Sequence, residues 1–155
     1  MLILKNLLFT LIVPGSAAVY IPYLLTRKDT AYGGISLPIA ILFFVTGAVI
    51  YLWCQWHFAS YGRGTPAPID APKKLVVRGL YKYVRNPMYV GVITTILGWV
   101  ILYHSWRLVR AAVFIWICFQ LFIVFYEEPH LRKVFGAEYE EYCARVGRWI
   151  PKITR

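Results

Sequence analysis

Charged residues are scarce in this sequence, and their scarcity excludes an ordinary soluble domain. They make up 15% of the chain, against about 25% in globular proteins. Hydrophobic residues make up 59%, so a lipid bilayer is the expected solvent. With 155 residues the chain has the length of one domain, and we predict a single integral membrane domain over residues 1–155.

Several features on which common activities depend are also absent. The three cysteines show no CxxC spacing, so neither a disulfide framework nor a metal site is predicted. No HExxH, GxSxG or GxxxxGK[ST] motif occurs, which excludes the metalloproteases, serine hydrolases and nucleotide triphosphatases that depend on them. The hydrophobic runs have no Asp, Glu, Lys or Arg in their central parts. Proton-coupled transporters and channels usually need such a group in the membrane, so a transporter is disfavoured.

What the sequence does contain is hydrophobic runs of about the length that crosses a bilayer, which takes roughly 20 residues of helix. There are four, at residues 4–25, 35–58, 88–103 and 108–126. Pro14 should kink the first run, which we interpret as a retained anchor because it lacks an obvious cleavage site. The last two runs are short and are separated only by residues 104–107. They are predicted to form a tight helical hairpin.

The basic residues lie between these runs and not on one periodic helical face. With four crossings, thirteen of the seventeen Lys and Arg fall on one side of the membrane, at the N-terminus, in residues 59–87 and in residues 127–155. The positive-inside rule then places both termini and the 59–87 loop in the cytoplasm. The net charge of +10 favours anionic membrane lipid over nucleic acid as partner. The prediction is a multi-pass protein of the inner (plasma) membrane of a prokaryote.

The two polar segments differ in character. The first half of the 59–87 loop is too rich in Gly and Pro to form a continuous helix, and its second half is basic and aromatic. In the tail, apolar residues recur at helical spacing from Leu131 to Val146, which predicts an amphipathic helix from Pro129 onward. The predicted fold is therefore all-α, a polytopic transmembrane helical bundle of about four spans plus a C-terminal amphipathic helix. Its parts are two N-terminal spans (1–58), a cytoplasmic loop (59–87), a helical hairpin (88–126) and a cytoplasmic tail (127–155).

An ordered series of short motifs begins in the second half of the loop. It consists of Leu75-Val76, Gly79-Leu80-Tyr81, Arg85-Asn86-Pro87-Met88-Tyr89-Val90-Gly91, Glu127-Glu128, Phe135-Gly136, Tyr139, Tyr142 and Ile150-Pro151. In this order the motifs resemble those of the isoprenylcysteine carboxyl methyltransferase and phospholipid methyltransferase family of integral membrane methyltransferases. The two N-terminal spans match that family only in being hydrophobic.

The resemblance implies an enzyme that uses S-adenosyl-L-methionine and methylates a lipidic or small amphiphilic acceptor at the cytoplasmic membrane face, as an isoprenylcysteine carboxyl methyltransferase does. A phospholipid N-methyltransferase and a non-catalytic lipid-binding membrane protein are the alternatives. A carboxylate such as Glu127 suits the α-ammonium of the cofactor, and an Arg, a Tyr hydroxyl or the amides of a helix start suit its carboxylate. The resemblance implies no metal, and it implies cofactor contacts for Leu75, Val76, Tyr81, Arg85, Asn86, Pro87, Met88, Tyr89, Glu127 and Glu128.

The sequence identifies fewer residues that would bind the methyl acceptor. His57, Arg85 and Asn86 are weak catalytic candidates, and Asn86 stands where the family usually has His. Ile123 stands where the eukaryotic carboxyl methyltransferases have an arginine that contacts the substrate, which raises the weight of an aminophospholipid or a thiol as acceptor. Arg63 and Thr65, in the loop where a substrate could enter, are candidate substrate-binding residues.

Purely structural interpretations of the same residues remain open. Asn86-Pro87 is also an ordinary helix start, with Asn as N-cap and Pro at the first position. The segment from Glu127 to Pro129 is also consistent with the end of one helix and the beginning of another. Tyrosines of the loop could form an interfacial aromatic belt, and a lone His57 is usually structural.

Overall fold

The structure, a computed structural model, describes residues 2–62 and 74–152, and most of these residues are helical. Within that part the β-structure is a single isolated bridge between Val84 and Gly147, so the all-α prediction is confirmed. Three helical stretches are long and apolar enough to cross a membrane, Leu7–Thr26, Ser36–Tyr61 and Trp106–Phe135, and a shorter apolar helix covers Pro87–Tyr103. The protein is an integral membrane protein, and this set agrees with about four spans.

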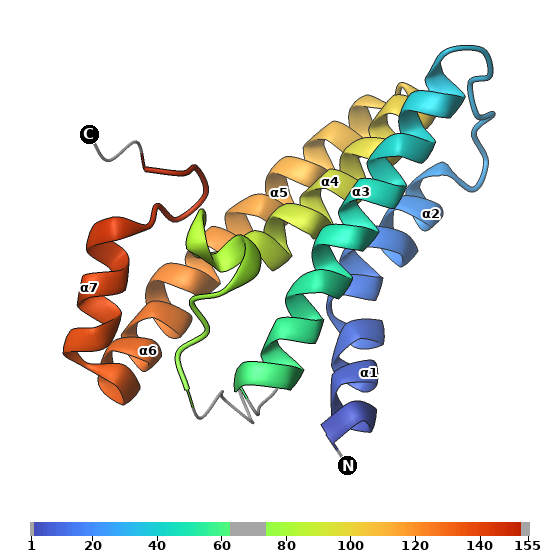
Figure 1. Ribbon diagram of the computed structural model, residues 1–155. Coiled ribbons are helices and arrows are strands. Elements are labelled where there is room, and N and C mark those ends of the chain that lie inside the picture. The colour runs from blue at the N-terminus through green and yellow to red at the C-terminus, as the bar shows by residue number, and fades with distance from the viewer. Residues whose placement is uncertain (1, 63–73, 153–155) are drawn as a thin grey trace.

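The first stretch is interrupted at the position of the predicted kink. Helix α1 (Leu2–Ile12) ends just before Pro14, and a π-helical segment, η1 (Ser16–Tyr20), leads into α2 (Ile21–Thr26). Proline has no N–H to donate to the preceding turn, which explains why the regular helix stops there. The ribbon changes direction at this point (Figure 1).

The second and third stretches pack closely because glycines lie between them. Helix α3 (Ser36–His57) continues through a π-helical segment, η2 (Phe58–Gly62), and so runs beyond the predicted end at residue 58. Helix α4 (Pro87–Tyr103) meets it backbone to backbone. A Cβ at Gly47 would lie 2.6 Å from the Gly91 carbonyl oxygen. Small residues permit such close approach between membrane helices.

This contact predicts a stability effect. In the Gly91→Ala variant the new methyl group would lie 2.9 Å from the Gly47 carbonyl oxygen and 3.1 Å from the Tyr51 nitrogen. Because both are backbone atoms, α3 and α4 must move apart. We expect the free energy of unfolding in detergent to fall by about 1–3 kcal/mol. Gly33→Ala is the control, since nothing lies within 4 Å of its new Cβ; equal stability of the two variants would contradict the close approach.

The last long stretch is one continuous helix made of α5 (Trp106–Phe122), the π-helical η4 (Ile123–Glu127) and α6 (Glu128–Phe135). The interpretation that Glu127-Glu128-Pro129 ends one helix and begins another is therefore wrong. Glu127 has helical dihedral angles, φ −70° and ψ −51°. The Glu128 N–H bonds to the Ile123 carbonyl in the wider π turn. Pro129, which lacks a donor, follows directly on this turn without ending the helix.

The tail is bent where a single amphipathic helix is predicted. Helix α7 (Ala137–Arg145) follows α6 after Gly136, whose φ of 52° and ψ of −125° break the helix. Glycine adopts this conformation readily because it has no Cβ. The prediction of one continuous helix from Pro129 to Val146 is therefore wrong. The helical spacing of apolar residues continues across the turn at Gly136, so the spacing alone does not reveal the break.

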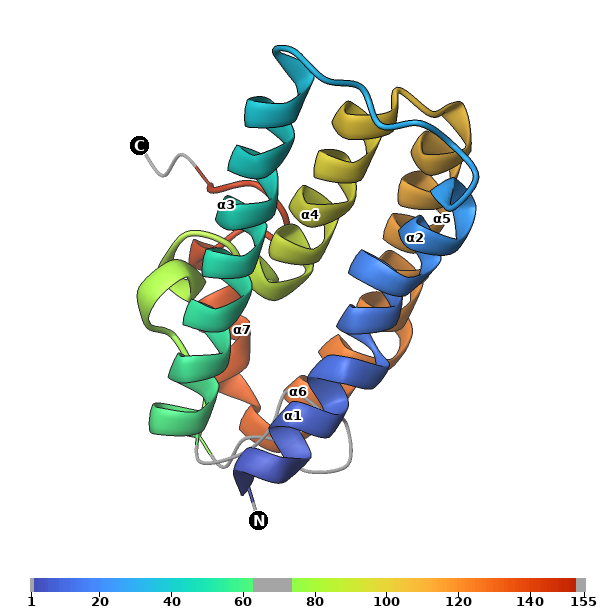
Figure 2. The ribbon, with the colours of Figure 1, turned by 90° about the vertical axis from the view of Figure 1, so that its right-hand side faces the viewer.

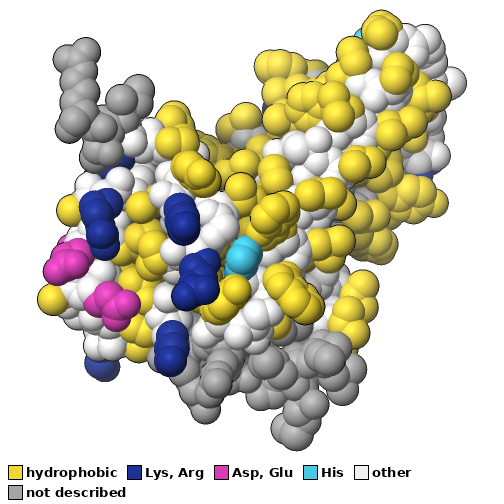
Figure 3. Space-filling model, viewed as in Figure 1, with side chains coloured by type: hydrophobic (Ala, Val, Ile, Leu, Met, Phe, Trp, Pro, Cys, Tyr) yellow, Lys and Arg dark blue, Asp and Glu magenta, His cyan; other side chains and the backbone are white. Residues whose placement is uncertain are grey.

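The loop and the tail meet at one end of the bundle (Figures 1 and 2). The loop contains a short 3₁₀ helix, η3 (Gly79–Lys82). The Tyr142 hydroxyl donates to the Tyr81 carbonyl at 2.7 Å, and the Arg85 N–H donates to the Gly147 carbonyl at 2.8 Å. Charged side chains gather over this end, whereas the helices beyond it present mainly hydrophobic side chains (Figure 3). The two polar segments with the sequence motifs thus form one region.

Candidate functional site

A cavity lies at the end where the loop and the tail meet. It encloses about 1140 Å³, its open mouth included, and most of its lining is apolar or aromatic. Nine of the ten residues expected to contact a cofactor line it: Leu75, Val76, Tyr81, Arg85, Asn86, Met88, Tyr89, Glu127 and Glu128. The tenth, Pro87, is buried beside them as the first residue of α4.

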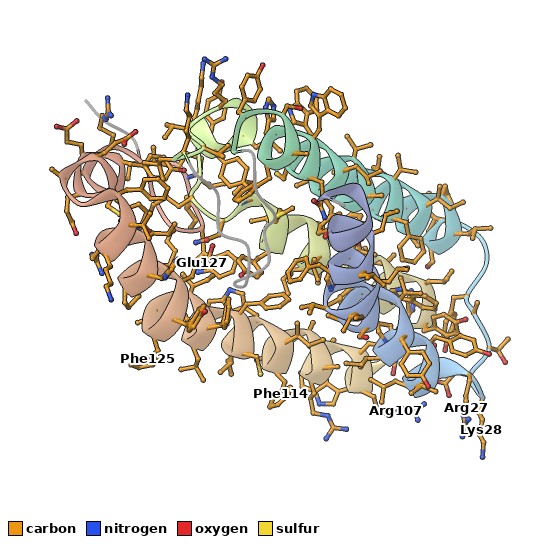
Figure 4. The ribbon with its side chains drawn as sticks, turned by 90° about the horizontal axis from the view of Figure 1, so that it is seen from below. Arg27, Lys28, Arg107, Phe114, Phe125 and Glu127 are labelled. Atoms are coloured by element: carbon orange, nitrogen blue, oxygen red, sulfur yellow. The ribbon has the colours of Figure 1, made fainter. Side chains whose placement is uncertain are left out.

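Glu127 presents an unneutralised carboxylate to this cavity. Its Oε2 accepts a hydrogen bond of 2.9 Å from the Tyr89 hydroxyl, and no Lys or Arg among residues 7–61 and 74–152, whose side chains the structure describes, forms an ion pair with it. Figure 4 shows Glu127 pointing inward, toward the loop, whereas Phe125 on the same helix points outward. The site can therefore receive a cationic group.

Glu128 is neutralised by arginines from two other segments. Its side chain accepts hydrogen bonds from Arg148 Nε at 2.7 Å and Nη2 at 3.0 Å, and it lies 3.2 Å from Arg85 Nη1. The bond to Glu128 raises the pKa of Arg148, so Arg148 stays charged. Glu128 is only 4% exposed. Its geometry indicates that it holds loop, helix and tail together, in contrast to its neighbour in sequence.

Arg85 leaves one donor unused beside the cavity. Its Nη1 contacts Glu128 and the Cys143 sulfur, the latter at 2.6 Å. Its Nε is buried without a hydrogen-bond partner among the described residues. A buried unpaired donor on a guanidinium is costly, and a ligand carboxylate in the cavity would satisfy it.

Asn86 contacts the tail and does not cap a helix. It precedes α4 as the sequence predicts, but its side chain makes no capping bond. Its Nδ2 donates to the Arg148 carbonyl at 3.3 Å, and the residue is 6% exposed. The amide therefore helps to fix the tail over the cavity.

Neutral aromatic side chains form the wall nearest the tail. Burial raises the pKa of the Tyr81 and Tyr142 phenols above the usual range, so both stay uncharged. The Tyr81 ring lies 5.4 Å from that of Phe58, edge to face. Tyr81 is therefore not part of an exposed aromatic belt, whereas Tyr83, with 62% exposure, lies at the surface.

Three other candidates are not brought to the cavity. His57 accepts a hydrogen bond from Trp53 Nε1 at 2.6 Å and stacks on Tyr61, and it is not among the lining residues. Its Nδ1 is buried without a hydrogen-bond partner among the described side chains. Arg63 and Thr65 lie outside the described residues.

The sequence analysis missed the histidine of the cavity, His130. Its ring is parallel to that of Tyr126, with 6.3 Å between the centroids, and its Nε2 is buried without a partner among the described residues. Helical spacing from Glu127 could have revealed it, but only if the helix had been expected to continue past Pro129. Ile123, on the same wall, is 1% exposed.

The known proteins that the chain resembles are methyltransferases. Residues 35–138 match the family model for phospholipid methyltransferase. The chain is 37% identical over 82 residues to protein-S-isoprenylcysteine O-methyltransferase B of Arabidopsis thaliana, which is 52% of this chain and 41% of that protein. It is 37% identical over 81 residues to a probable protein-S-isoprenylcysteine O-methyltransferase of Oryza sativa subsp. indica, with 52% and 42% covered. The match thus spans less than half the length of these relatives. No solved structure matches the chain.

Proposed function

The chain belongs to the phospholipid methyltransferase family, and on that basis we propose that it transfers a methyl group from S-adenosyl-L-methionine to an amphiphilic acceptor at the cytoplasmic membrane face. The observation that carries the proposal is that one cavity is lined both by a carboxylate without a cationic partner among the described side chains and by an arginine with an unpaired N–H donor. These are the Glu127 carboxylate and the Arg85 Nε–H.

The two groups suit the amino-acid part of this cofactor, which carries an ammonium and a carboxylate. Glu127 would bind the ammonium, and Arg85 would donate to the carboxylate in a charge-assisted hydrogen bond. Glu128 contacts Arg85 Nη1 at 3.2 Å, so it positions the guanidinium. Apolar and aromatic lining residues such as Val76, Tyr81 and Met88 offer surface for an adenine ring.

When bound, S-adenosyl-L-methionine would supply an electrophilic methyl group on its sulfonium. The protein then needs to align the acceptor with that methyl group and to exclude water, and no covalent nucleophile is required. The tail, held over the loop by Tyr142 and Asn86, serves to close the site. The lining is also apolar at Phe9, Val13 and Phe122, which suits a lipid tail.

The names of the relatives make the carboxyl group of a prenylated cysteine the first acceptor to test, and the amine of a phospholipid the second. Purified protein in nanodiscs should bind S-adenosyl-L-methionine by calorimetry. It should transfer labelled methyl to N-acetyl-S-farnesylcysteine or to phosphatidylethanolamine. Failure of folded protein to bind the cofactor would refute the proposal. Binding without transfer to either acceptor would favour a non-catalytic lipid-binding protein.

Loss of the hydrogen bond that Glu127 accepts from Tyr89 should weaken cofactor binding moderately. Tyr89→Phe removes the hydroxyl that donates to Glu127 Oε2 and leaves the ring in place. Because hydrogen bonds to charged groups contribute about 1.5–3 kcal/mol, we expect cofactor affinity to fall by about tenfold, measured by calorimetry. Tyr83→Phe is the control, since Tyr83 is exposed at the surface. An affinity unchanged in Tyr89→Phe would show that this hydroxyl does not orient Glu127 for binding.

A further inference from the structure

His130 lies on the wall of the cavity that the last long helix provides. The lining residues of that helix recur every three or four positions, as one helical face does: Phe119, Phe122, Ile123, Tyr126, Glu127, His130 and Leu131. His130 is half-buried, and its Nε2 has no partner among residues 7–61 and 74–152, the side chains that the structure describes. A buried ring nitrogen without a partner, on a side chain that lines a cavity, can receive a partner from a ligand after a small side-chain movement.

This face is graded from polar to apolar along the helix. Towards the middle of the helix from His130 come Tyr126, Phe122 and Phe119, and Phe9 and Val13 of the first stretch line the same cavity. A molecule with a polar head and a long apolar tail would fit this wall with its head at His130. Its tail would then follow the aromatic side chains towards the membrane interior.

The other polar groups of the cavity are already committed. Glu127 and Arg85 are assigned above to the cofactor, Glu128 is neutralised by arginines, and Asn86 bonds to the tail. Ile123, one turn before Glu127, is apolar and fully buried, so it offers no hydrogen bond. His130 differs from them in having a buried side-chain nitrogen that no described residue pairs and that the proposed function has not used.

We infer that His130 binds the head of the acceptor, donating an Nε2–H hydrogen bond to its carboxylate. The inference rests on the proposed function and adds a specificity-determining residue to it. With its proton on Nε2, an imidazole is a donor. A carboxylate attacks the methyl group without losing a proton, so no base is needed, and the role of His130 is to hold the acceptor in line.

The test uses a complex that cannot turn over. Protein in nanodiscs is saturated with S-adenosylhomocysteine, and N-acetyl-S-farnesylcysteine is titrated in by calorimetry. We compare wild type with His130→Gln, whose amide can place a donor near Nε2, and His130→Phe, which has none. Since a hydrogen bond to a charged group contributes about 1.5–3 kcal/mol, His130→Phe should bind the acceptor at least about tenfold more weakly. His130→Gln should stay near wild type, and the affinity for S-adenosylhomocysteine should be equal in all three.

Each alternative outcome is distinct. If His130→Phe binds both ligands like wild type, the inference is wrong and the proposed function stands. If His130→Gln is as weak as His130→Phe, hydrogen-bond donation at this position is refuted. The farnesylcysteine methyl ester has no carboxylate, so a His130→Phe defect of equal size with the ester would also overturn the inference. If wild type does not bind S-adenosylhomocysteine, the proposed function itself fails.

Discussion

Glu127→Ala should reduce the affinity for S-adenosyl-L-methionine by about a hundredfold or more. Removing one partner of a buried, hydrogen-bonded charge pair typically costs 2–5 kcal/mol or more, and Glu127 is the carboxylate of the cavity without a cationic partner among the described residues. Its loss would leave the ammonium of the ligand buried and unpaired. Calorimetry on protein in nanodiscs measures the effect directly.

Two further variants test whether the charge of Glu127 causes this loss of affinity. Glu127→Gln keeps the shape and the contact with Tyr89 but removes the charge, so it should lose most of the affinity as well. Glu141→Gln removes a charge from the exposed face of α7 and should leave binding unchanged. Retention of wild-type affinity by Glu127→Gln would show that the charge of this residue does not bind the ligand.

Glu128→Ala should instead destabilise the protein. Removing one member of a buried ion pair leaves the other charge buried without a partner, which lowers the free energy of unfolding by about 3–5 kcal/mol. Here the variant would leave Arg85, whose side chain is 11% exposed, and Arg148, at 32%, without their shared carboxylate. We expect the free energy of unfolding in detergent to fall by about 3 kcal/mol or more, with the tail separating from the loop. Tail release is measurable as increased proteolysis after α6.

Glu140→Ala is the matched control for stability. Glu140 pairs with Arg132 at 2.7 Å, but both side chains are about half exposed, at 57% and 47%. Solvent screens such pairs, so this variant should unfold almost like wild type. If Glu128→Ala were as stable as Glu140→Ala, the arginines would not depend on Glu128, and its role in holding the tail would be refuted.

The contrast between the two glutamates bears on how the site works. They are adjacent and of one residue type, yet Glu127 is free to bind a ligand while Glu128 is bound to the arginines that shape the cavity. Substitutions at both positions should weaken ligand binding, because Glu128 positions Arg85, but only those at Glu128 should also lower the free energy of unfolding. An activity measurement alone would not separate them.

The motifs that carry the family resemblance named nine of the residues that line the cavity, fewer than half of its lining. The sequence by itself determined the membrane character and the all-helical class. These follow from local properties, because long apolar runs must form helices in a bilayer that offers no hydrogen bonds to the backbone. Motifs such as Arg85-Asn86-Pro87 and Glu127-Glu128 can also be recognised in the sequence, because the residues within each motif are consecutive. The interruption at Pro14 could be predicted for the same reason, since proline acts on its own turn.

Only the tertiary structure decided what each polar group does. Glu128 differs from Glu127 because Arg148, twenty residues away, reaches it, and Asn86 bonds to the tail because the tail folds back over α4. The helix continues past Pro129 because of the π turn before it, and His130 therefore lies at the cavity. A prediction that ends the helix at the proline cannot place His130 there. Hydrogen bonds and ion pairs depend on distances of a few ångströms between segments far apart in the chain, and those distances exist only once the helices have packed.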